Sequence, residues 1–251
     1  LYRIALGHPN VRAIFQNPDD LALFQSNHLV RRNSTIMIKG CGVDMDDFVP
    51  APEPDGIPVV LFPARIIGDK GVREFVEAAR ILRGQGIQAT FRLVGRTDPD
   101  NPTDIGEPVV RAWEREGLVE WKGFATDMAT EFAQCHMVCM PSYREGLPRV
   151  LIEAAACGRP IVAADVPGCR EVVRDGETGT LVPVRDAMGT ALALRRLIEN
   201  GDIRGQMGAA GRKMAEAEFS SESFVANSMA VYDAVLGDRL PSQIHAPKAI
   251  D

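Results

Sequence analysis

The sequence predicts an α/β fold, a doubly wound parallel sheet with helices on both faces. Between residues 58 and 182, short apolar runs alternate with longer amphipathic ones. Strands that read as nearly continuous hydrophobes are buried on both faces, as in a parallel sheet covered by helices. Right-handed crossovers between such strands give a Rossmann-like arrangement.

Six runs in this region have the length and apolar character of buried strands, and four stretches between them have those of helices. The predicted strands are residues 59–62, 90–94, 118–121, 137–140, 160–163 and 180–182. The predicted helices are residues 72–83, 108–116, 127–135 and 148–157. We assign residues 59–220 to one Rossmann-like domain.

Beyond Val182 the pattern becomes helical. The predicted helices are residues 186–199, 202–218 and 221–236. Either Ser220 or Ser221 is suited to cap the last of them, and Glu222 lies in its first turn. The tail, residues 237–251, is rich in proline and polar residues and is predicted to be disordered.

Upstream, residues 1–49 read as about one βαβ unit. Its predicted elements are a strand at 11–15, a helix at 19–28 and a strand at 35–38. Four prolines then mark residues 50–58 as a linker. One βαβ unit is too little for a domain, and the chain begins at Leu1 in mid-pattern, so we expect the trailing edge of a truncated N-terminal domain.

Composition indicates a soluble globular protein, with 251 residues, 45% hydrophobic and 25% charged. A net charge of −6 without a basic stripe argues against a nucleic-acid partner, but a few placed cations can still hold a small anion. Five cysteines in mostly apolar surroundings suit free thiols in a reducing compartment, so we expect a cytoplasmic protein. A peripheral position at the inner face of the membrane is left open.

The first candidate site follows the first strand of the main domain. Arg65 and Lys70 lie in a loop with Gly68 and Gly71, just before a predicted helix. Ligands of open α/β sheets bind beyond the carboxyl ends of the strands, and arginine and lysine are suited to phosphate oxygens. The alternative is a solvated loop with ordinary surface cations.

The second candidate lies between residues 141 and 158. Pro148 suits the first turn of a helix, whose free amides form an anion site that Gly146 allows a ligand to approach. Glu145 lies in the loop, whereas Glu153 lies inside an apolar helical run. A carboxylate there is costly unless it is used, and ribose hydroxyls are natural donors to it.

Two glutamates separated by seven residues, behind Pro141-Ser142 and ahead of residues 158–163 (Gly-Arg-Pro-Ile-Val-Ala), resemble the signature of retaining glycosyltransferases of family 4, which have the GT-B fold. The loop with Arg65 and Lys70 matches that family's Gly-Arg…Lys-Gly element, except that Ala64 stands where glycine is usual. Residues 166–173, 176–179 and 40–44 ahead of Phe48 fit the family as well.

The resemblance implies roles for individual residues. Arg65 and Lys70 would neutralise the diphosphate of a nucleotide-sugar donor, and Glu145 would contact the hydroxyls of its sugar. The remaining donor-binding assignments are Glu153 on the ribose, Gly146, Leu147 and Pro148 under the phosphates, and Gly95 and Gly123. The helix at 221–236 would cross back to the N-terminal domain.

The strings at 143–148 and 153–160 look most like enzymes that build capsule, O-antigen or exopolysaccharide repeats on polyprenyl-diphosphate carriers. That similarity favours a UDP-sugar donor and a lipid-linked or saccharide acceptor, with retention of configuration. It implies no cofactor beyond the substrate and no metal, since cations take the metal's place. The acceptor site would lie in the missing N-terminal domain, so we expect the fragment alone to be inactive.

The sequence leaves three alternatives to a glycosyltransferase. One is a module that binds a nucleotide sugar without turnover, and others are an epimerase or a phosphorylase of the same fold. The Asp-x-Asp triplets at 44–46 and 98–100 match the spelling of metal-dependent transferases, but such triplets are common in acidic loops. Cys135, His136 and Cys139 enter a buried strand, where alternate side chains point apart, so we expect no zinc.

Overall fold

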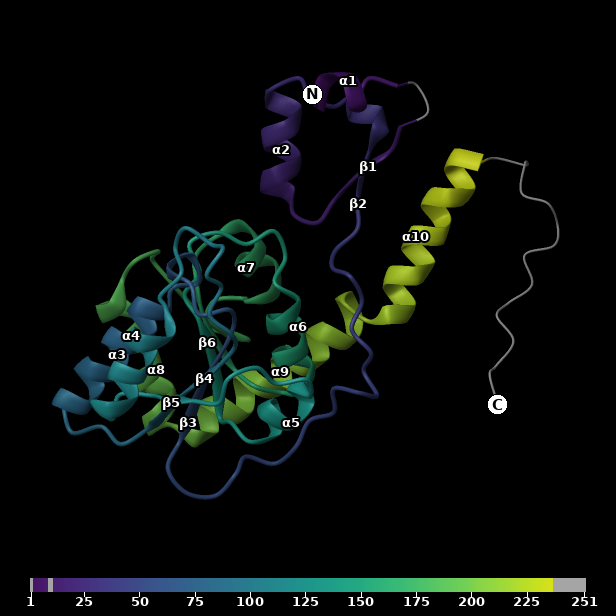
Figure 1. Ribbon diagram of the computed structural model, residues 1–251. Coiled ribbons are helices and arrows are strands. Elements are labelled where there is room, and N and C mark those ends of the chain that lie inside the picture. The colour runs from purple at the N-terminus through teal and green to yellow at the C-terminus, as the bar shows by residue number, and fades with distance from the viewer. Residues whose placement is uncertain (1, 9–10, 237–251) are drawn as a thin grey trace.

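A computed structural model describes residues 2–8 and 11–236 of the chain (Figure 1). The predicted fold class is confirmed by a sheet of six parallel strands in the order β5-β4-β3-β6-β7-β8. The strands are β3 (Val59–Pro63), β4 (Thr90–Val94), β5 (Glu120–Trp121), β6 (Met137–Met140), β7 (Ile161–Ala164) and β8 (Gly179–Val182). β5 is shorter than predicted because the Leu118 amide donates to the carbonyl of Trp113 instead of entering the sheet.

The strand order reverses between β3 and β6. The chain runs outward from β3 through β4 to β5, and then returns to place β6 on the other side of β3. Val60 of β3 accordingly pairs with Phe91 of β4 on one side and with Met137 of β6 on the other. In open α/β sheets the ligand crevice lies outside the carboxyl ends of strands at such a reversal.

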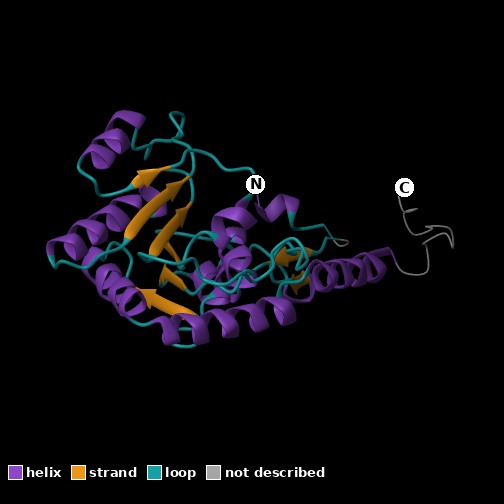
Figure 2. Ribbon diagram, turned by 90° about the horizontal axis from the view of Figure 1, so that it is seen from below, coloured by secondary structure: helices purple, strands orange, loops and turns teal. Residues whose placement is uncertain are grey.

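Helices cover both faces of the sheet (Figure 2). One apolar core lies under α3 (Val72–Gly84), α4 (Glu107–Arg115) and α8 (Ala187–Glu199), and includes the packed rings of Phe62 and Phe75. The second core lies under α5 (Met128–Ala133), α6 (Arg149–Ala156) and α7 (Pro167–Val172). α9 (Gly201–Glu218) contributes to both. The short helix α7 was not predicted.

The N-terminal segment forms the predicted βαβ unit. Its elements are α1 (Tyr2–Ala5), β1 (Ala13–Phe15), α2 (Pro18–Ser26), the 3-10 turn η1 (Arg32–Ser34) and β2 (Thr35–Met37). β1 and β2 pair in parallel as a separate two-stranded sheet, and Figure 1 shows this unit apart from the six-stranded sheet. The predicted linker has no regular secondary structure but is anchored, since Arg159 donates to the carbonyl of Ala51 and Arg204 pairs with Glu53.

The last described helix is α10 (Ser221–Leu236), which extends away from the six-stranded sheet in Figures 1 and 2. Its start is capped by Ser220, whose hydroxyl accepts from the Ser223 amide. Val231 is its one buried residue. Within residues 2–8 and 11–236, no helix has the length and apolar character needed to cross a membrane. The tail predicted to be disordered lies outside the described residues.

Candidate functional site

The two candidate loops of the sequence form one site. The β3–α3 loop (residues 64–71) and the β6–α6 loop (residues 141–148) both leave the carboxyl edge of the sheet at its reversal point. Lys70 donates from Nζ to Oε1 of Glu145 over 2.6 Å, and the two side chains are 23% and 10% exposed. A carboxylate this buried needs a cationic partner, and Lys70 supplies it.

A glycine allows the two loops to touch. Gly71 has a φ of +75°, and a Cβ at this position would overlap the carbonyl oxygen of Pro141. The Tyr143 amide also donates to the carbonyl of Asp69 over 2.9 Å. The backbone therefore holds Lys70 and Glu145 within reach of each other, independently of their own side-chain bond.

The β6–α6 loop is held by its carbonyl groups. The carbonyl of Glu145 accepts from the Gly168 amide over 3.2 Å, and that of Gly146 accepts from Nδ2 of Asn17 over 2.8 Å. The amides of Gly146 and Leu147 have no acceptor among the described residues. Two free N–H donors beside a cation are suited to an anion.

The helix after this loop starts one residue later than predicted. α6 begins at Arg149, and Pro148 is its N-cap, with an extended backbone and no side-chain cap bond. Proline before the helix still removes one amide that would otherwise need an acceptor. The predicted position of the loop under an anion is unaffected by this shift.

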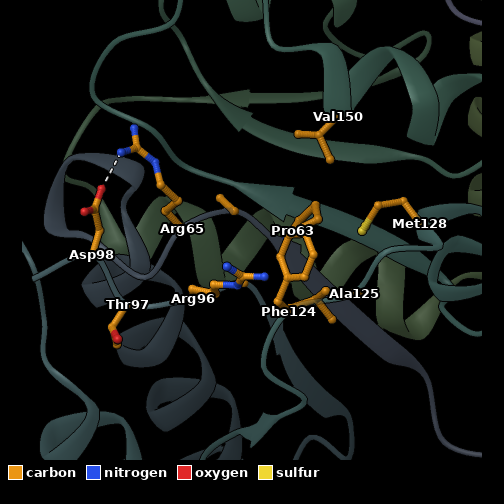
Figure 3. Close-up of a pocket in the computed structure, with 12 residues that line it drawn as sticks. Pro63, Arg65, Arg96, Thr97, Asp98, Phe124, Ala125, Met128 and Val150 are labelled. Carbon is orange, nitrogen blue, oxygen red and sulfur yellow. Dashed lines mark hydrogen bonds and ion pairs between the residues drawn. The ribbon is translucent and has the colours of Figure 1, made fainter.

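A pocket of about 480 Å³ adjoins the β3–α3 loop (Figure 3). Its lining comes from the ends of β3 and β4 and their loops, from the loop after β5, and from α5 and α6, and comprises Pro63, Ala64, Arg65, Val94, Gly95, Arg96, Thr97, Asp98, Phe124, Ala125, Met128 and Val150. Met128 and Val150 give it an apolar wall, and the Arg96 guanidinium lies over the Phe124 ring at 4.1 Å. The pocket suits a flat, partly apolar group.

The remaining predicted residues lie around this pocket. Arg65 lines it, is 56% exposed and pairs with Asp98 over 2.5 Å. Gly95 also lines it, and a Cβ there would overlap the carbonyl oxygen of Ala64, so glycine lets the loops after β3 and β4 come together. Gly123 is outside the lining but accepts from the Gly95 amide over 2.7 Å.

Glu153 is buried, at 7% exposure, on α6 one turn from Val150 of the pocket wall. Nε of Arg149 donates to its Oε1 over 2.8 Å. Burial raises the pKa of the Glu153 carboxyl, and the bond from Arg149 opposes that rise. Arg149 is thus a partner for this carboxylate four residues earlier on the same helix.

Sequence reasoning missed several residues at the site. A second hollow, of about 390 Å³, is lined by Arg65 and Lys70 together with Tyr143, Arg144 and Arg185. The Arg185 guanidinium lies 4.6 Å from the Tyr143 ring centroid, although α6, β7, α7 and β8 lie between these two residues in the chain. Asn17 and Gly168 also bond to the β6–α6 loop from distant parts of the chain. Gly168 lies in a segment that fits the family, whereas no local pattern marks Asn17 or Arg185.

The other sequence candidates have structural partners. Oδ1 of Asp44 accepts from the Asp46 amide over 2.9 Å in a turn, and Asp98 binds Arg65. Nδ1 of His136 accepts from the Val59 amide over 2.9 Å. In the part of the chain that the structure describes, no group of three His, Cys, Asp or Glu side chains could hold a metal ion.

The doubly wound sheet of six parallel strands matches the structures of GT-B glycosyltransferases. The chain belongs to the family described as glycosyl transferases group 1, whose model matches residues 57–200. Its fold is that of sucrose-phosphate synthase from Thermosynechococcus elongatus, with a TM-score of 0.77 and 28% identity, covering 89% of this chain and 58% of that one.

Two curated relatives are similar in sequence. One is the N,N'-diacetylbacillosaminyl-diphospho-undecaprenol alpha-1,3-N-acetylgalactosaminyltransferase of Campylobacter jejuni, 30% identical over 76% of this chain and 52% of that protein. The other is the capsular polysaccharide biosynthesis glycosyltransferase CapM of Staphylococcus aureus, 27% identical over 71% of this chain and 46% of that protein. The chain spans about half the length of these relatives.

Proposed function

We propose that this chain is the donor-binding half of a retaining glycosyltransferase. The donor is a nucleoside diphosphate sugar, with UDP as the nucleotide, and the acceptor is a lipid-linked or other saccharide of surface polysaccharide synthesis. The observation that carries the proposal is the Lys70–Glu145 pair beside the free amides of Gly146 and Leu147, next to a pocket of about 480 Å³.

The order of groups along the crevice matches the order of groups in the donor. The partly apolar pocket takes the base, with Met128 and Val150 on one side of it. The diphosphate then lies against Arg65, Lys70 and the free amides of the β6–α6 loop, and the sugar comes to Glu145. Oε2 of Glu153, which has no protein partner among the described residues, is left to accept from the ribose hydroxyls.

The chemical task of this half is stabilisation of the leaving group. As the bond from the anomeric carbon to the phosphate oxygen breaks, negative charge grows on the diphosphate. In the proposed complex Lys70, Arg65 and the two amides lie where that charge develops, and such preorganised donors lower the barrier. Lys70 also separates the carboxylate of Glu145 from the phosphates, which reduces the repulsion between two anionic groups.

The names of the relatives support the acceptor class. One relative is named for a diphospho-undecaprenol substrate and the other for capsular polysaccharide biosynthesis. Because a polyprenyl carrier resides in a membrane, the complete enzyme would work in the cytoplasm at the inner membrane face. The acceptor would be held mainly by residues beyond this chain.

Nucleotide titration of the chain tests the proposal. Isothermal calorimetry should show UDP binding more tightly than GDP or ADP, and Lys70→Ala should weaken UDP by about tenfold or more while leaving uridine unchanged, since uridine has no phosphate. Lys213→Ala, on the exposed face of α9, removes the same charge away from the site and should change neither. If no nucleoside diphosphate binds, or if Lys70→Ala weakens uridine equally, the proposal is wrong.

A transfer assay separates this function from a binding module without turnover. The chain carries the donor residues and spans about half of its relatives, so we expect it to bind UDP without transferring sugar by itself. The full-length protein should transfer sugar to a polyprenyl-diphosphate-linked saccharide. Binding without transfer by the full-length protein would favour the binding module.

A further inference from the structure

Asn17 lies fully buried between the N-terminal βαβ unit and the β6–α6 loop. It is the N-cap of α2, and its Oδ1 accepts from the Asp20 amide over 2.7 Å. Its Nδ2 donates to Oδ2 of Asp20 over 2.9 Å and to the carbonyl of Gly146 over 2.8 Å. A backbone amide only donates and a carbonyl only accepts, so these partners define the orientation of the Asn17 amide.

The bond to Gly146 determines where the next amide points. In a trans peptide the carbonyl and the following N–H point in opposite directions, and the described residues contain no cis peptide bond. With the carbonyl of Gly146 directed at Asn17, the Leu147 N–H is directed away from it. The Glu145 carbonyl, bonded to Gly168, turns the Gly146 N–H outward in the same way.

Two further contacts place the N-terminal unit against this region. Gly40, which follows β2, lies against the Leu147 side chain, so that an added Cβ would stand 3.5 Å from its Cδ2. Asp19 of α2 lies 3.8 Å from Arg170 of α7. The Asp19–Arg170 pair is exposed and contributes little, whereas the bond from Asn17 is shielded from water.

We propose that Asn17 is a positioning residue that couples the placement of residues 11–49 to binding of the diphosphate. It does not touch the donor. Its amide holds the Gly146 peptide group so that the Leu147 N–H faces the phosphates, and without that bond the glycine-containing loop samples other orientations. Because coupling between two binding events is reciprocal, a bound diphosphate in turn favours docking of the N-terminal unit on the loop. This inference rests on the proposed function only for the identity of the ligand.

Two substitutions separate positioning from helix capping. Asn17→Ser keeps a short hydroxyl that can cap α2, whereas Asn17→Ala removes it, and both lose the Nδ2 amide group that donates to the Gly146 carbonyl. Calorimetry should show UDP binding about tenfold weaker in both variants, and uridine binding unchanged. Gln16→Ala is the matched control, since the adjacent Gln16 amide donates to the carbonyl of Gly40, outside the β6–α6 loop. It should leave both affinities unchanged.

The loop itself is measured without ligand. Backbone ¹⁵N relaxation should give lower order parameters at Gly146 and Leu147 in Asn17→Ser than in the unaltered chain, and unchanged order parameters in Gln16→Ala. Three results would each overturn the inference. They are unchanged backbone order parameters in Asn17→Ser, a weaker affinity for UDP in Asn17→Ala alone, and an equal loss of affinity for UDP and for uridine. If the unaltered chain binds no UDP, the proposed function fails, and the relaxation experiment still decides whether Asn17 positions the loop.

Discussion

Lys70 and Glu145 are joined by a hydrogen-bonded ion pair of 2.6 Å across the reversal point of the sheet. The pair links the loop that follows β3 to the loop that follows β6. Each residue therefore has two tasks, because it stabilises its buried partner in the free protein and faces the donor in the proposed complex. These two tasks can be measured separately.

The stability of the pair is tested by a double-mutant cycle. Lys70→Ala leaves the Glu145 carboxylate buried without a cation and should lower the free energy of unfolding by about 1–3 kcal/mol. Adding Glu145→Gln to Lys70→Ala should recover most of that loss, since the remaining buried group is then neutral. Urea unfolding of Lys70→Ala, Glu145→Gln and the double variant measures the coupling energy between the two side chains. Strictly additive losses would show that the pair contributes nothing.

The two glutamates should have different kinetic effects in the full-length transferase. In the proposed complex Glu145 meets the part of the donor whose charge changes, so Glu145→Gln should mainly lower kcat, on the order of 10²-fold. Glu153 would meet a ribose that does not react, so Glu153→Gln should mainly raise the donor KM, with a loss of about 1–3 kcal/mol. Steady-state kinetics decide between these roles. An effect of Glu145→Gln on KM alone, with loss of turnover in Glu153→Gln, would reverse them.

Glu153 should make stability depend on pH. Its pKa is raised in the folded protein above the ordinary 4.5, so folding favours the protonated form, and stability falls as pH rises from the unfolded pKa through the folded one. Glu153→Gln, which is neutral at every pH, should therefore melt higher than the unaltered chain at pH 8. The advantage should shrink as pH falls towards 4. A constant difference across this range would contradict the burial argument.

Activity of the full-length transferase should survive EDTA. In the proposed complex Arg65 and Lys70, which line one hollow, take the role that a divalent ion has in metal-dependent transferases, so side chains would neutralise the diphosphate. Sugar transfer in EDTA should equal transfer in the absence of chelator. Complete loss that manganese restores would reopen the acidic triplets at 44–46 and 98–100.

Cys41 should be the one thiol of the native chain that reacts quickly with a disulfide reagent at pH 8. It is exposed, whereas the other four cysteines are buried. Burial raises the pKa of Cys135 and Cys169 to about 12 and of Cys157 to about 11, and it raises that of Cys139 as well. Reaction with one equivalent is expected in buffer and with five in urea. A second fast equivalent in buffer would show that one of the four buried thiols opens locally.

Local pattern predicted most of the secondary structure of the Rossmann-like domain. Residues 137–140 are an example, since all four are apolar and all four are buried, as expected for a strand covered on both faces. The exceptions are short elements. α7, of six residues, was not predicted, and β5 was predicted at 118–121 but pairs over only two residues.

The sequence by itself determined the fold class and the loops that carry the site. Lys70 and Glu145 each lie in a loop between a predicted strand and a predicted helix. Parallel strands place their carboxyl ends at one edge of the sheet, so both loops were expected at that edge. Only the tertiary structure decided which groups meet there. Asn17, for example, bonds to Gly146, which lies 129 positions further along the chain. Local periodicity reports which face of an element is buried, but which two buried faces meet depends on the crossovers between strands, and so on the chain as a whole.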